Sequence, residues 1–317
     1  MANIIKKNAK FASMNDFKVH ILGCGSATPS LRHLPACQAI EHRGRVMLVD
    51  CGEGAQLSIR RQRLKFSRIT DVFISHLHGD HFLGLPGLLC TLALHDVGGT
   101  VHVHVFEEGA RLLREILSVV AHESALKIEY DIIDPAGGVV YEDSSLTVTA
   151  FPLYHRIPCV GFRFDEKPKQ RHLRGDMIKF FDIPIKYLPD IKAGADWVKP
   201  DGEVIANDRL TTPADHSGSY AYCSDTMFNP RVAKTVEGVD VLYHEATYAD
   251  DFGELAHANG HSTARQAAEI AKMAGVGELL IGHYSKRYET AERHLADARA
   301  VFPETRAADE GMTITIV

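Results

Sequence analysis

A dense group of ligand-type side chains occurs in the stretch ISHLHGDHFLGLPGLL, residues 74–89. Six consecutive positions contain three histidines and an aspartate: His76, His78, Asp80 and His81. Side chains two positions apart at the end of a strand point the same way, so His76 and His78 can bind one cation. We expect Asp80 and His81, which follow the turn, to face a second cation.

The ligand types indicate the metal and the kind of site. Imidazole and carboxylate groups without a thiolate suit zinc, manganese or iron(II), and a site without cysteines favours a catalytic metal with open coordination. Two such ions need about seven ligands. Three further candidates, His155, Asp225 and His283, follow strand-like runs. A carboxylate such as that of Asp225 can bridge two cations about 3.5–4 Å apart.

The composition narrows the class of protein. The chain has 317 residues, a net charge of −6 and 45% hydrophobic residues, which indicates a globular protein and no overall electrostatic preference for nucleic acid. Six cysteines without a CxxC pair favour reduced thiols in the cytoplasm. Residues 1–17 lack the apolar core of a secretion signal, and no apolar run is long enough to span a membrane.

Apolar periodicity predicts an alternation of strands and helices, typical of an α/β protein. The predicted strands are 17–25, 46–52, 71–75, 101–106, 145–153, 219–225, 239–247, 278–285 and 312–317. The predicted helices are 53–64, 82–95, 109–121 and 262–274. Residues 165–215 are rich in Lys, Asp, Pro and Gly, and we interpret them as an insertion with little core of its own.

Several motifs, taken together, resemble one family. The pattern His-x-His-x-Asp-His at 76–81 is similar to that of the metallo-β-lactamase superfamily. The further motifs are ILGCGSATP (21–29), VDCGEGAQ (49–56), YCSDT (222–226), HEATY (244–248), HSTARQAAEIA (261–271) and GHYSKRY (282–288). With the 74–89 stretch they resemble ribonuclease Z, the tRNA 3′-processing endonuclease, over nearly the whole chain.

The resemblance implies a fold and a ligand set. The fold would be an αββα sandwich within a single domain, residues 1–317, with an inserted tRNA-binding arm at 165–215. One metal would be bound by His76, His78, His155 and Asp225, and the second by Asp80, His81, Asp225 and His283. The catalytic residues would be Asp80, His261 and Glu245, with Glu245 orienting His261.

The implied reaction is hydrolysis of the phosphodiester that joins the 3′ trailer to precursor tRNA. We expect two divalent cations, zinc first and manganese or iron(II) as alternatives, to generate hydroxide that attacks phosphorus. His261 would then protonate the departing 3′ oxygen, which leaves a 3′-hydroxyl on the tRNA.

The expected RNA contacts are basic and polar residues near the site and in the arm. They are Lys167, Lys169, Arg171, Arg174, Ser285 and Arg287. Residues 60–68 carry a further basic run that equally fits a solvated helix face. The segment Ile183–Tyr187 departs from the Gly-Pro-rich arm tip common in the family. The family is commonly homodimeric, so we expect a homodimer and no membrane association.

Two other functions fit parts of the sequence. A small-molecule phosphodiesterase, or another hydrolase of the superfamily such as a lactonase, would need the metal ligands but not the arm. A non-catalytic RNA-binding relative would be expected to have lost ligands, whereas all seven are present here. The sequence leaves open the native metal, the preference for precursors with or without encoded CCA, and the conformation of the arm.

Overall fold

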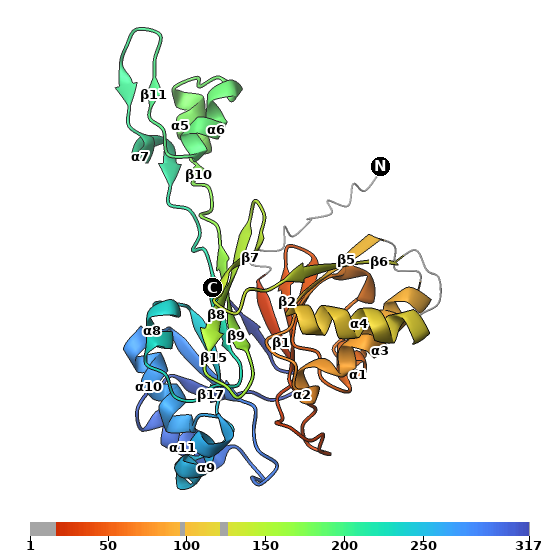
Figure 1. Ribbon diagram of the computed structural model, residues 1–317. Helices are drawn as coiled ribbons and strands as arrows, with labels where there is room; N and C mark the ends of the chain where they lie inside the picture. The colour runs from red at the N-terminus through yellow and green to blue at the C-terminus, as the bar shows by residue number, and fades with distance from the viewer. Residues whose placement is uncertain (1–16, 96–98, 121–125, 317) are drawn as a thin grey trace, which may run out of the picture.

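The computed structural model describes residues 17–95, 99–120 and 126–316. Two seven-stranded sheets face each other, and helices cover the outer face of each sheet (Figure 1). This arrangement confirms the expected αββα sandwich. Most of the N-terminal segment considered above, residues 1–16, lies outside the described residues. None of the helices in the described part of the chain has the length and apolar character needed to cross a bilayer.

The first sheet has the strand order β18-β1-β2-β3-β4-β5-β6. Its strands are β18 (Thr313–Thr315), β1 (Lys18–Gly23), β2 (Cys37–His42), β3 (Arg45–Val49), β4 (Ile69–Phe73), β5 (Gly99–Val105) and β6 (Leu126–Ile132). Strands β3 to β6 run parallel, so their carboxyl ends meet at one edge. Its helices are α1 (Ala55–Arg61), η1 (Phe66–Arg68), α2 (Gly79–Phe82), α3 (Gly84–Leu94) and α4 (Glu107–Val120).

The second sheet has the strand order β17-β16-β15-β14-β9-β8-β7. Its strands are β17 (Thr305–Ala307), β16 (Glu278–Gly282), β15 (Val241–Glu245), β14 (Ser219–Cys223), β9 (Cys159–Glu166), β8 (Leu146–Leu153) and β7 (Gly138–Glu142). Strands β14 to β17 run parallel. Its helices are α8 (Arg231–Thr235), η3 (Asp250–Phe252), α9 (Gly253–Asn259), α10 (Ala264–Ala274) and α11 (Glu292–Arg299).

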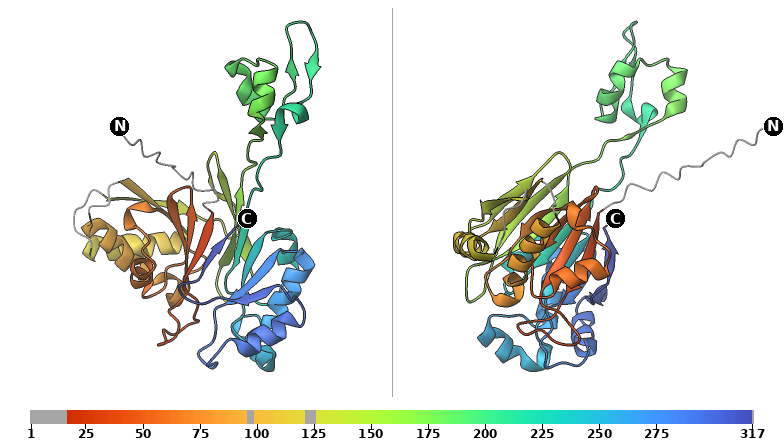
Figure 2. Two further views of the ribbon diagram at one scale, coloured as in Figure 1. Left: turned by 180° about the vertical axis from the view of Figure 1, so that it is seen from behind. Right: turned by 90° about the vertical axis from the view of Figure 1, so that its right-hand side faces the viewer.

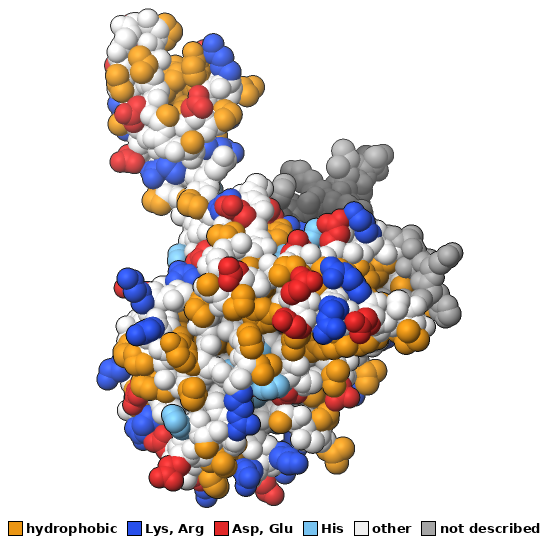
Figure 3. Space-filling model, viewed as in Figure 1, with side chains coloured by type: hydrophobic (Ala, Val, Ile, Leu, Met, Phe, Trp, Pro, Cys, Tyr) orange, Lys and Arg blue, Asp and Glu red, His pale blue; other side chains and the backbone are white. Residues whose placement is uncertain are grey.

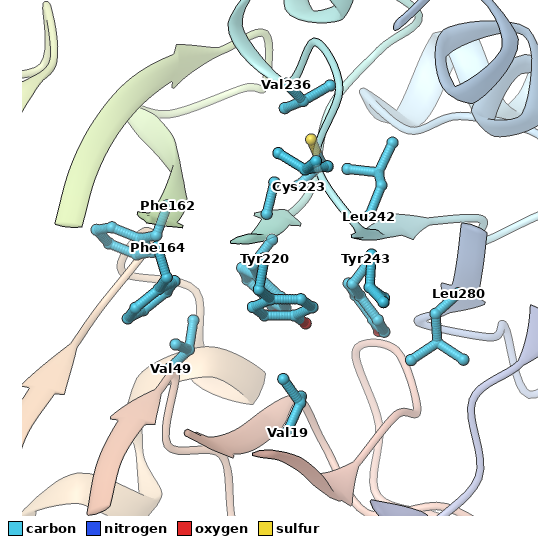
Figure 4. Packing of buried hydrophobic residues seen from close by; sticks show 14 of the residues in the cluster. Val19, Val49, Phe162, Phe164, Tyr220, Cys223, Val236, Leu242, Tyr243 and Leu280 are labelled. Atoms are coloured by element: carbon cyan, nitrogen blue, oxygen red, sulfur yellow. The ribbon is translucent and has the colours of Figure 1, made fainter. Parts of the chain in front are cut away.

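The main core lies between the two sheets. Figure 4 shows Phe162, Phe164, Tyr220 and Tyr243 of the second sheet facing Val19 and Val49 of the first. These side chains are at most 2% exposed, and burial of each large apolar side chain contributes about 1.5–3 kcal/mol. The packed sheets therefore form a rigid base for the loops at the carboxyl ends of their strands.

A segment between β9 and β14 projects far from the sandwich, and the views from other sides agree (Figures 1 and 2). It contains β10 (His172–Leu173), α5 (Gly175–Phe180), η2 (Ile185–Tyr187), α6 (Leu188–Lys192), β11 (Trp197–Val198), β12 (Val204–Ile205), α7 (Asn207–Leu210) and β13 (Thr211–Thr212). We call this projecting segment, residues 167–217, the arm. On the visible face its hydrophobic and charged side chains are interspersed (Figure 3).

The arm has a small hydrophobic core, whose residues the sequence pattern did not single out. Its buried members are Ile183, Ile191, Trp197, Ile205 and Leu210. These residues are scattered over short elements without a helical or strand-like period, so the hydrophobic pattern of the sequence did not predict their burial. Their burial gives the arm a defined shape of its own.

The predicted elements correspond closely to the observed ones. All nine predicted strands overlap observed strands, and the helix predicted at 82–95 is divided at Leu83 into α2 and α3. The last residues of two predicted elements, 121 and 317, lie outside the described residues. The prediction missed the strands β2, β6, β7, β9 and β17 and the helices α8, α9 and α11.

Candidate metal and catalytic site

The site lies where the strands of both sheets end. His76 follows β4, Asp225 and His283 follow β14 and β16, and Glu245 is the last residue of β15. Because β14, β15 and β16 are adjacent and parallel, their carboxyl ends bring these side chains to one edge. His155 arrives from the end of β8. The seven predicted ligands thus come together although up to 207 positions, from 76 to 283, separate them.

The first cluster consists of His76, His78, His155 and Asp225. His78 Nδ1 lies 3.1 Å from both His76 Nε2 and His155 Nε2. Asp225 Oδ2 lies 3.5 Å from His76 Nε2 and 3.7 Å from His155 Nε2. Three ring nitrogens and one carboxylate oxygen therefore converge on a single position, which is the ligand set of a tetrahedral cation.

The second cluster consists of Asp80, His81 and His283. Asp80 Oδ2 lies 3.6 Å from His81 Nε2 and 3.5 Å from His283 Nε2. The other oxygen of Asp225, Oδ1, lies 3.4 Å from His81 Nε2 and 3.2 Å from His283 Nε2. Asp225 thus directs one carboxylate oxygen to each cluster, as a bridging ligand would.

Hydrogen bonds fix which nitrogen of each ring faces the clusters. His155 Nδ1 lies 2.7 Å from the carbonyl oxygen of Gly260, and because that oxygen only accepts, Nδ1 carries the proton. His81 Nδ1 lies 2.7 Å from Asp50 Oδ2 and is protonated for the same reason. The Nε2 lone pairs of both rings are then available to a metal, which is the usual arrangement around ligand histidines.

The residues fit divalent cations. In neutral rings with protonated Nδ1, His76 Nε2 and His155 Nε2 are acceptors, and both lie 3.1 Å from His78 Nδ1, which can supply at most one proton. Within the described part of the chain, Asp225 Oδ1 is buried and has no hydrogen-bond partner. A cation would satisfy these facing acceptors, whereas a side-chain hydrogen-bond network cannot.

The electrostatics favour the metal-binding forms of the four residues in the first cluster. Burial, followed by the neighbouring imidazoles, lowers the pKa of His76 well below its usual value, and burial likewise lowers the pKa of His78 and His155. Burial would raise the pKa of Asp225, but His283, His81 and His261 outweigh it and hold the pKa well below its usual range. The rings of His76, His78 and His155 are therefore neutral and the carboxylate of Asp225 is ionised, as metal ligands must be. For His81, burial is outweighed by Asp225 and Asp50, which raise its pKa well above the usual value, so a cation would have to displace that proton.

Asp50 supports the site from behind and was missed by the sequence interpretation. Its carboxylate accepts hydrogen bonds from Ser75 N, at 2.8 Å, and from Tyr222 Oη, at 2.8 Å, besides that from His81. Asp50 is fully buried and has the left-handed φ of 56°. The sequence shows only an aspartate directly after an apolar run, in VDCGEG, and the strain appears only in the structure.

His261 and Glu245 form a second hydrogen-bonded unit beside the metal clusters. Glu245 Oε1 lies 3.1 Å from His261 Nδ1, and His261 Nδ1 is also 3.9 Å from Asp225 Oδ2. Thr247 Oγ1 donates to Glu245 Oε2 at 2.8 Å and lies 2.9 Å from His283 Nδ1. Thr247, which the sequence interpretation also missed, therefore connects the Glu245–His261 pair to a metal ligand.

The charge of Glu245 sets the protonation of His261. Burial alone would lower the pKa of His261, but the carboxylates of Glu245 and Asp225 outweigh burial and raise it to about 9. With Nδ1 held by Glu245, Nε2 is the nitrogen that can exchange a proton with a substrate. The geometry and charge therefore suit a proton donor.

The chain around His261 is fixed by two local features. Gly260 has a left-handed φ of 79°, and a Cβ there would lie 2.9 Å from His155 Nδ1. Only glycine allows this turn and the close approach of its backbone to His155. Thr263 caps α10, and Thr263 and Gln266 form a reciprocal capping box. His261 is thus held between a required glycine and a helix N-terminus.

A cavity of about 480 Å³ opens over the clusters. Besides ligands and His261, its lining includes Ser285, Lys286, Arg156 and Asn259. Ser285 thus lies where we expected a phosphate contact. Arg287 does not line this cavity: its guanidinium lies 5.8 Å from the centre of the Phe252 ring, on a neighbouring cavity. Lys286 and Arg156 are the cationic side chains that line the cavity.

The four basic residues of the arm that we expected to contact RNA are each paired with an acidic residue. Lys167 Nζ lies 2.8 Å from Glu142, and Lys169 Nζ lies 2.7 Å from Glu166. Similar pairs join Arg171 to Asp208 at 2.9 Å and Arg174 to Asp176 at 3.5 Å. The pairs of Lys167, Arg171 and Arg174 are at least partly exposed, and such pairs contribute only about 0–1 kcal/mol, so an RNA phosphate can compete for these three side chains. The Lys169–Glu166 pair is largely buried.

The two sheets and the histidine–aspartate clusters define a metallo-β-lactamase-fold hydrolase. The crystal structure of the short form of human tRNase Z is similar to the chain, with a TM-score of 0.69 and 26% identity over 95% of this chain and 99% of that one. Ribonuclease Z of Bacteroides fragilis is 49% identical over 96% of this chain and 100% of its own length. Ribonuclease Z of Parabacteroides distasonis is 47% identical over the same shares. The chain therefore belongs to the ribonuclease Z family.

A further similarity covers the N-terminal half. The family model described as anti-Pycsar protein Apyc1 matches residues 17–173. This range holds five of the seven predicted ligands, from His76 to His155, but not Asp225 or His283. The ribonuclease Z relatives, in contrast, match 96% of the chain, a range that includes Asp225 and His283.

Proposed function

We propose that the chain is a tRNA 3′-processing endoribonuclease that removes the 3′ trailer from precursor tRNA. The observation that carries the proposal is that Asp225, which directs one oxygen to each cluster, lies beside the Glu245–His261 pair. Asp225 and His261 line the same cavity. The near full-length relatives named ribonuclease Z support the choice of RNA as substrate.

Two divalent cations, which we propose to be zinc, would be held by the two clusters. His76, His78, His155 and Asp225 would bind one, and Asp80, His81, Asp225 and His283 the other. When bound, such cations supply Lewis-acid chemistry, by lowering the pKa of water and neutralising phosphoryl oxygens. Imidazole and carboxylate ligands without a thiolate also accept manganese or iron(II), so metal analysis has to decide among the three.

The residues of the chain supply orientation and a proton. Glu245 holds His261 Nδ1, so that His261 Nε2 can protonate the 3′ oxygen of the tRNA as the P–O3′ bond breaks. Water provides the new bond to phosphorus, and the trailer leaves with a 5′-phosphate. Lys286 and Ser285 line the cavity and would contact the phosphodiester on either side of the cleaved bond.

The arm would bind the body of the tRNA away from the cavity. Its projection from the sandwich gives it the reach, and Lys167, Arg171 and Arg174 would exchange their carboxylate partners for phosphates. We propose a homodimer as the working unit, as is common in the family. The six cysteines, all within the described residues, carry unpaired thiols, which supports our assignment to the reducing cytoplasm.

Cleavage of two precursor tRNAs, with and without encoded CCA, tests the proposal under defined metals. We expect a tRNA ending in a 3′-hydroxyl and a trailer beginning with a 5′-phosphate. A product with a 2′,3′-cyclic phosphate would contradict the proposed roles. Hydrolysis of a chromogenic phosphodiester without cleavage of either precursor would indicate a small-molecule phosphodiesterase instead.

A further inference from the structure

A second kind of metal-ligating cluster lies apart from the seven proposed ligands. It consists of Cys24, directly after β1, His33 in the following loop, and Glu310, which precedes β18. The ligand atoms of these three residues all lie within 4.8 Å of one another. No member of this group takes part in the proposed cleavage reaction, so the cluster needs an explanation of its own.

The distances match those between the ligands of one zinc ion. Cys24 Sγ lies 3.4 Å from His33 Nδ1, and His33 Nδ1 lies 3.6 Å from Glu310 Oε1. Ligands about 2.0–2.3 Å from a tetrahedral zinc are separated by about 3.3–3.8 Å. Asp309 Oδ1 lies 3.9 Å from the same ring nitrogen but outside the mutually close group of three, so its exposed side chain would have to move to become a fourth ligand. Thiolate, imidazole and carboxylate together are a donor set typical of zinc.

The backbone is arranged to bring these residues together. A Cβ on Gly25 would lie 2.9 Å from the Cβ of His33, so only glycine lets the two strands of the loop approach this closely. Gly25 N donates to the carbonyl of Leu34 at 2.9 Å, and Leu34 N donates to Glu310 Oε1 at 2.6 Å. The loop is thereby closed upon Cys24, whose side chain is fully buried.

We propose that Cys24, His33 and Glu310 form an additional zinc site that lies outside the active centre, with water as the fourth ligand. Its ion ties the loop after β1 to the segment before β18. The same loop touches the active centre, because Ala27 N donates to Asp80 Oδ2 at 2.6 Å. Zinc here would therefore fix a loop that orients one of the proposed catalytic ligands.

Binding at this site must displace one proton. Burial, with Glu310 and Asp309, raises the pKa of the Cys24 thiol well above its usual value, so the thiol is protonated at neutral pH. The bound zinc would replace that proton, which passes to solvent, and the affinity for zinc therefore increases with pH. The Glu310 carboxylate and the Cys24 thiolate then supply two negative charges, which balance those of the ion.

Cobalt substitution distinguishes this site from the active centre. The proposed active-centre ligands include no cysteine, so only the additional site can give a thiolate-to-cobalt charge-transfer band in the near ultraviolet. We expect this band when Co²⁺ is titrated into the full chain after removal of metals by a chelator. Zinc analysis of the purified chain should show one equivalent more than that of the Cys24→Ser variant.

Matched variants decide the outcome. Cys24→Ser and His33→Ala should each abolish or strongly weaken the band, whereas Cys90→Ser, which changes a cysteine on α3, should retain it. His33 is partly exposed, so its variant tests the site even if Cys24→Ser does not fold. Absence of the band in the unaltered chain, or its persistence in Cys24→Ser, would overturn the proposal. Neither readout depends on cleavage of RNA.

Discussion

Glu245 Oε1 lies 3.1 Å from His261 Nδ1, and the carboxylate that makes this contact is almost completely fixed by the backbone. Thr226 N and Ser262 N donate to Oε1 at 3.1 and 2.9 Å, and Thr247 N donates to Oε2 at 2.9 Å. Burial would raise the pKa of Glu245, but His261 outweighs burial and lowers it. Glu245 is therefore an anion that cannot turn away from His261.

Replacing His261 by alanine should separate catalysis from metal binding. The substitution removes the proposed proton donor, and general acid catalysis contributes about 10²–10⁴-fold, so kcat should fall within that range. All seven proposed ligands remain, and metal content should be unchanged. Single-turnover cleavage of precursor tRNA together with metal analysis checks both statements. Loss of metal from this variant would mean that His261 is itself a ligand.

The Glu245→Gln variant should change the pH dependence of cleavage. The pKa of His261 is raised to about 9 chiefly by Glu245, which keeps the acid protonated at higher pH. Glutamine removes that charge, so the pKa of His261 falls and the loss of kcat with rising pH should begin at lower pH. Profiles of kcat against pH for both proteins provide the measurement. An alkaline limb at the same pH in both would assign it to another group.

The residues that gather in the two clusters could be proposed from the sequence because their types and positions are visible in short local segments. His76 to His81 are contiguous, and Asp225 and His283 each follow an apolar run. Asp50 could not be assigned in the same way. Its contact with His81 depends on β3 lying parallel beside β4, with Val49 opposite Phe73, and this pairing joins distant segments. Strand register of this kind is absent from local periodicity.

The side chains of Ser285 to Arg287 show that sequence spacing does not predict the direction in which a side chain points. The motif was predicted to place Arg287 at the cleavage site, but the structure directs it over Phe252 and leaves Lys286 on the cavity. The direction of consecutive side chains after a strand depends on the turn that follows, which sequence spacing does not determine. The arm core was missed for a related reason, because Trp197 and its partners come from several short elements.

Asp50→Asn should weaken metal binding without removing a ligand. Asparagine keeps the size of the side chain but loses the charge that polarises His81 Nδ1–H, and changes of this kind cost about 10–100-fold in metal affinity. Asp71→Asn is the matched control, because Asp71 is equally buried and contacts His104 Nε2 at 3.0 Å, a residue outside the proposed ligands. Competition titration with a chromophoric chelator measures both affinities. An equal loss of metal affinity in the two variants would indicate that Asp50 acts only by stabilising the fold.

Gly260→Ala should disturb the site beyond its effect on folding. Gly275 provides the comparison: both glycines have a left-handed φ at a helix C-terminus, 79° and 61°, and alanine there costs about 1–2 kcal/mol in either case. A Cβ at Gly275 meets nothing within 4 Å among the described residues, whereas one at Gly260 would lie 2.9 Å from His155 Nδ1. Chemical denaturation should therefore show comparable losses of unfolding free energy in the two variants. Only Gly260→Ala should displace the His155 ring and lower metal affinity, because the hydrogen bond from His155 Nδ1 to the Gly260 carbonyl sets the orientation of that ring. If metal affinity fell equally in both variants, overall destabilisation would account for the loss, and the Gly260–His155 contact would have no specific role.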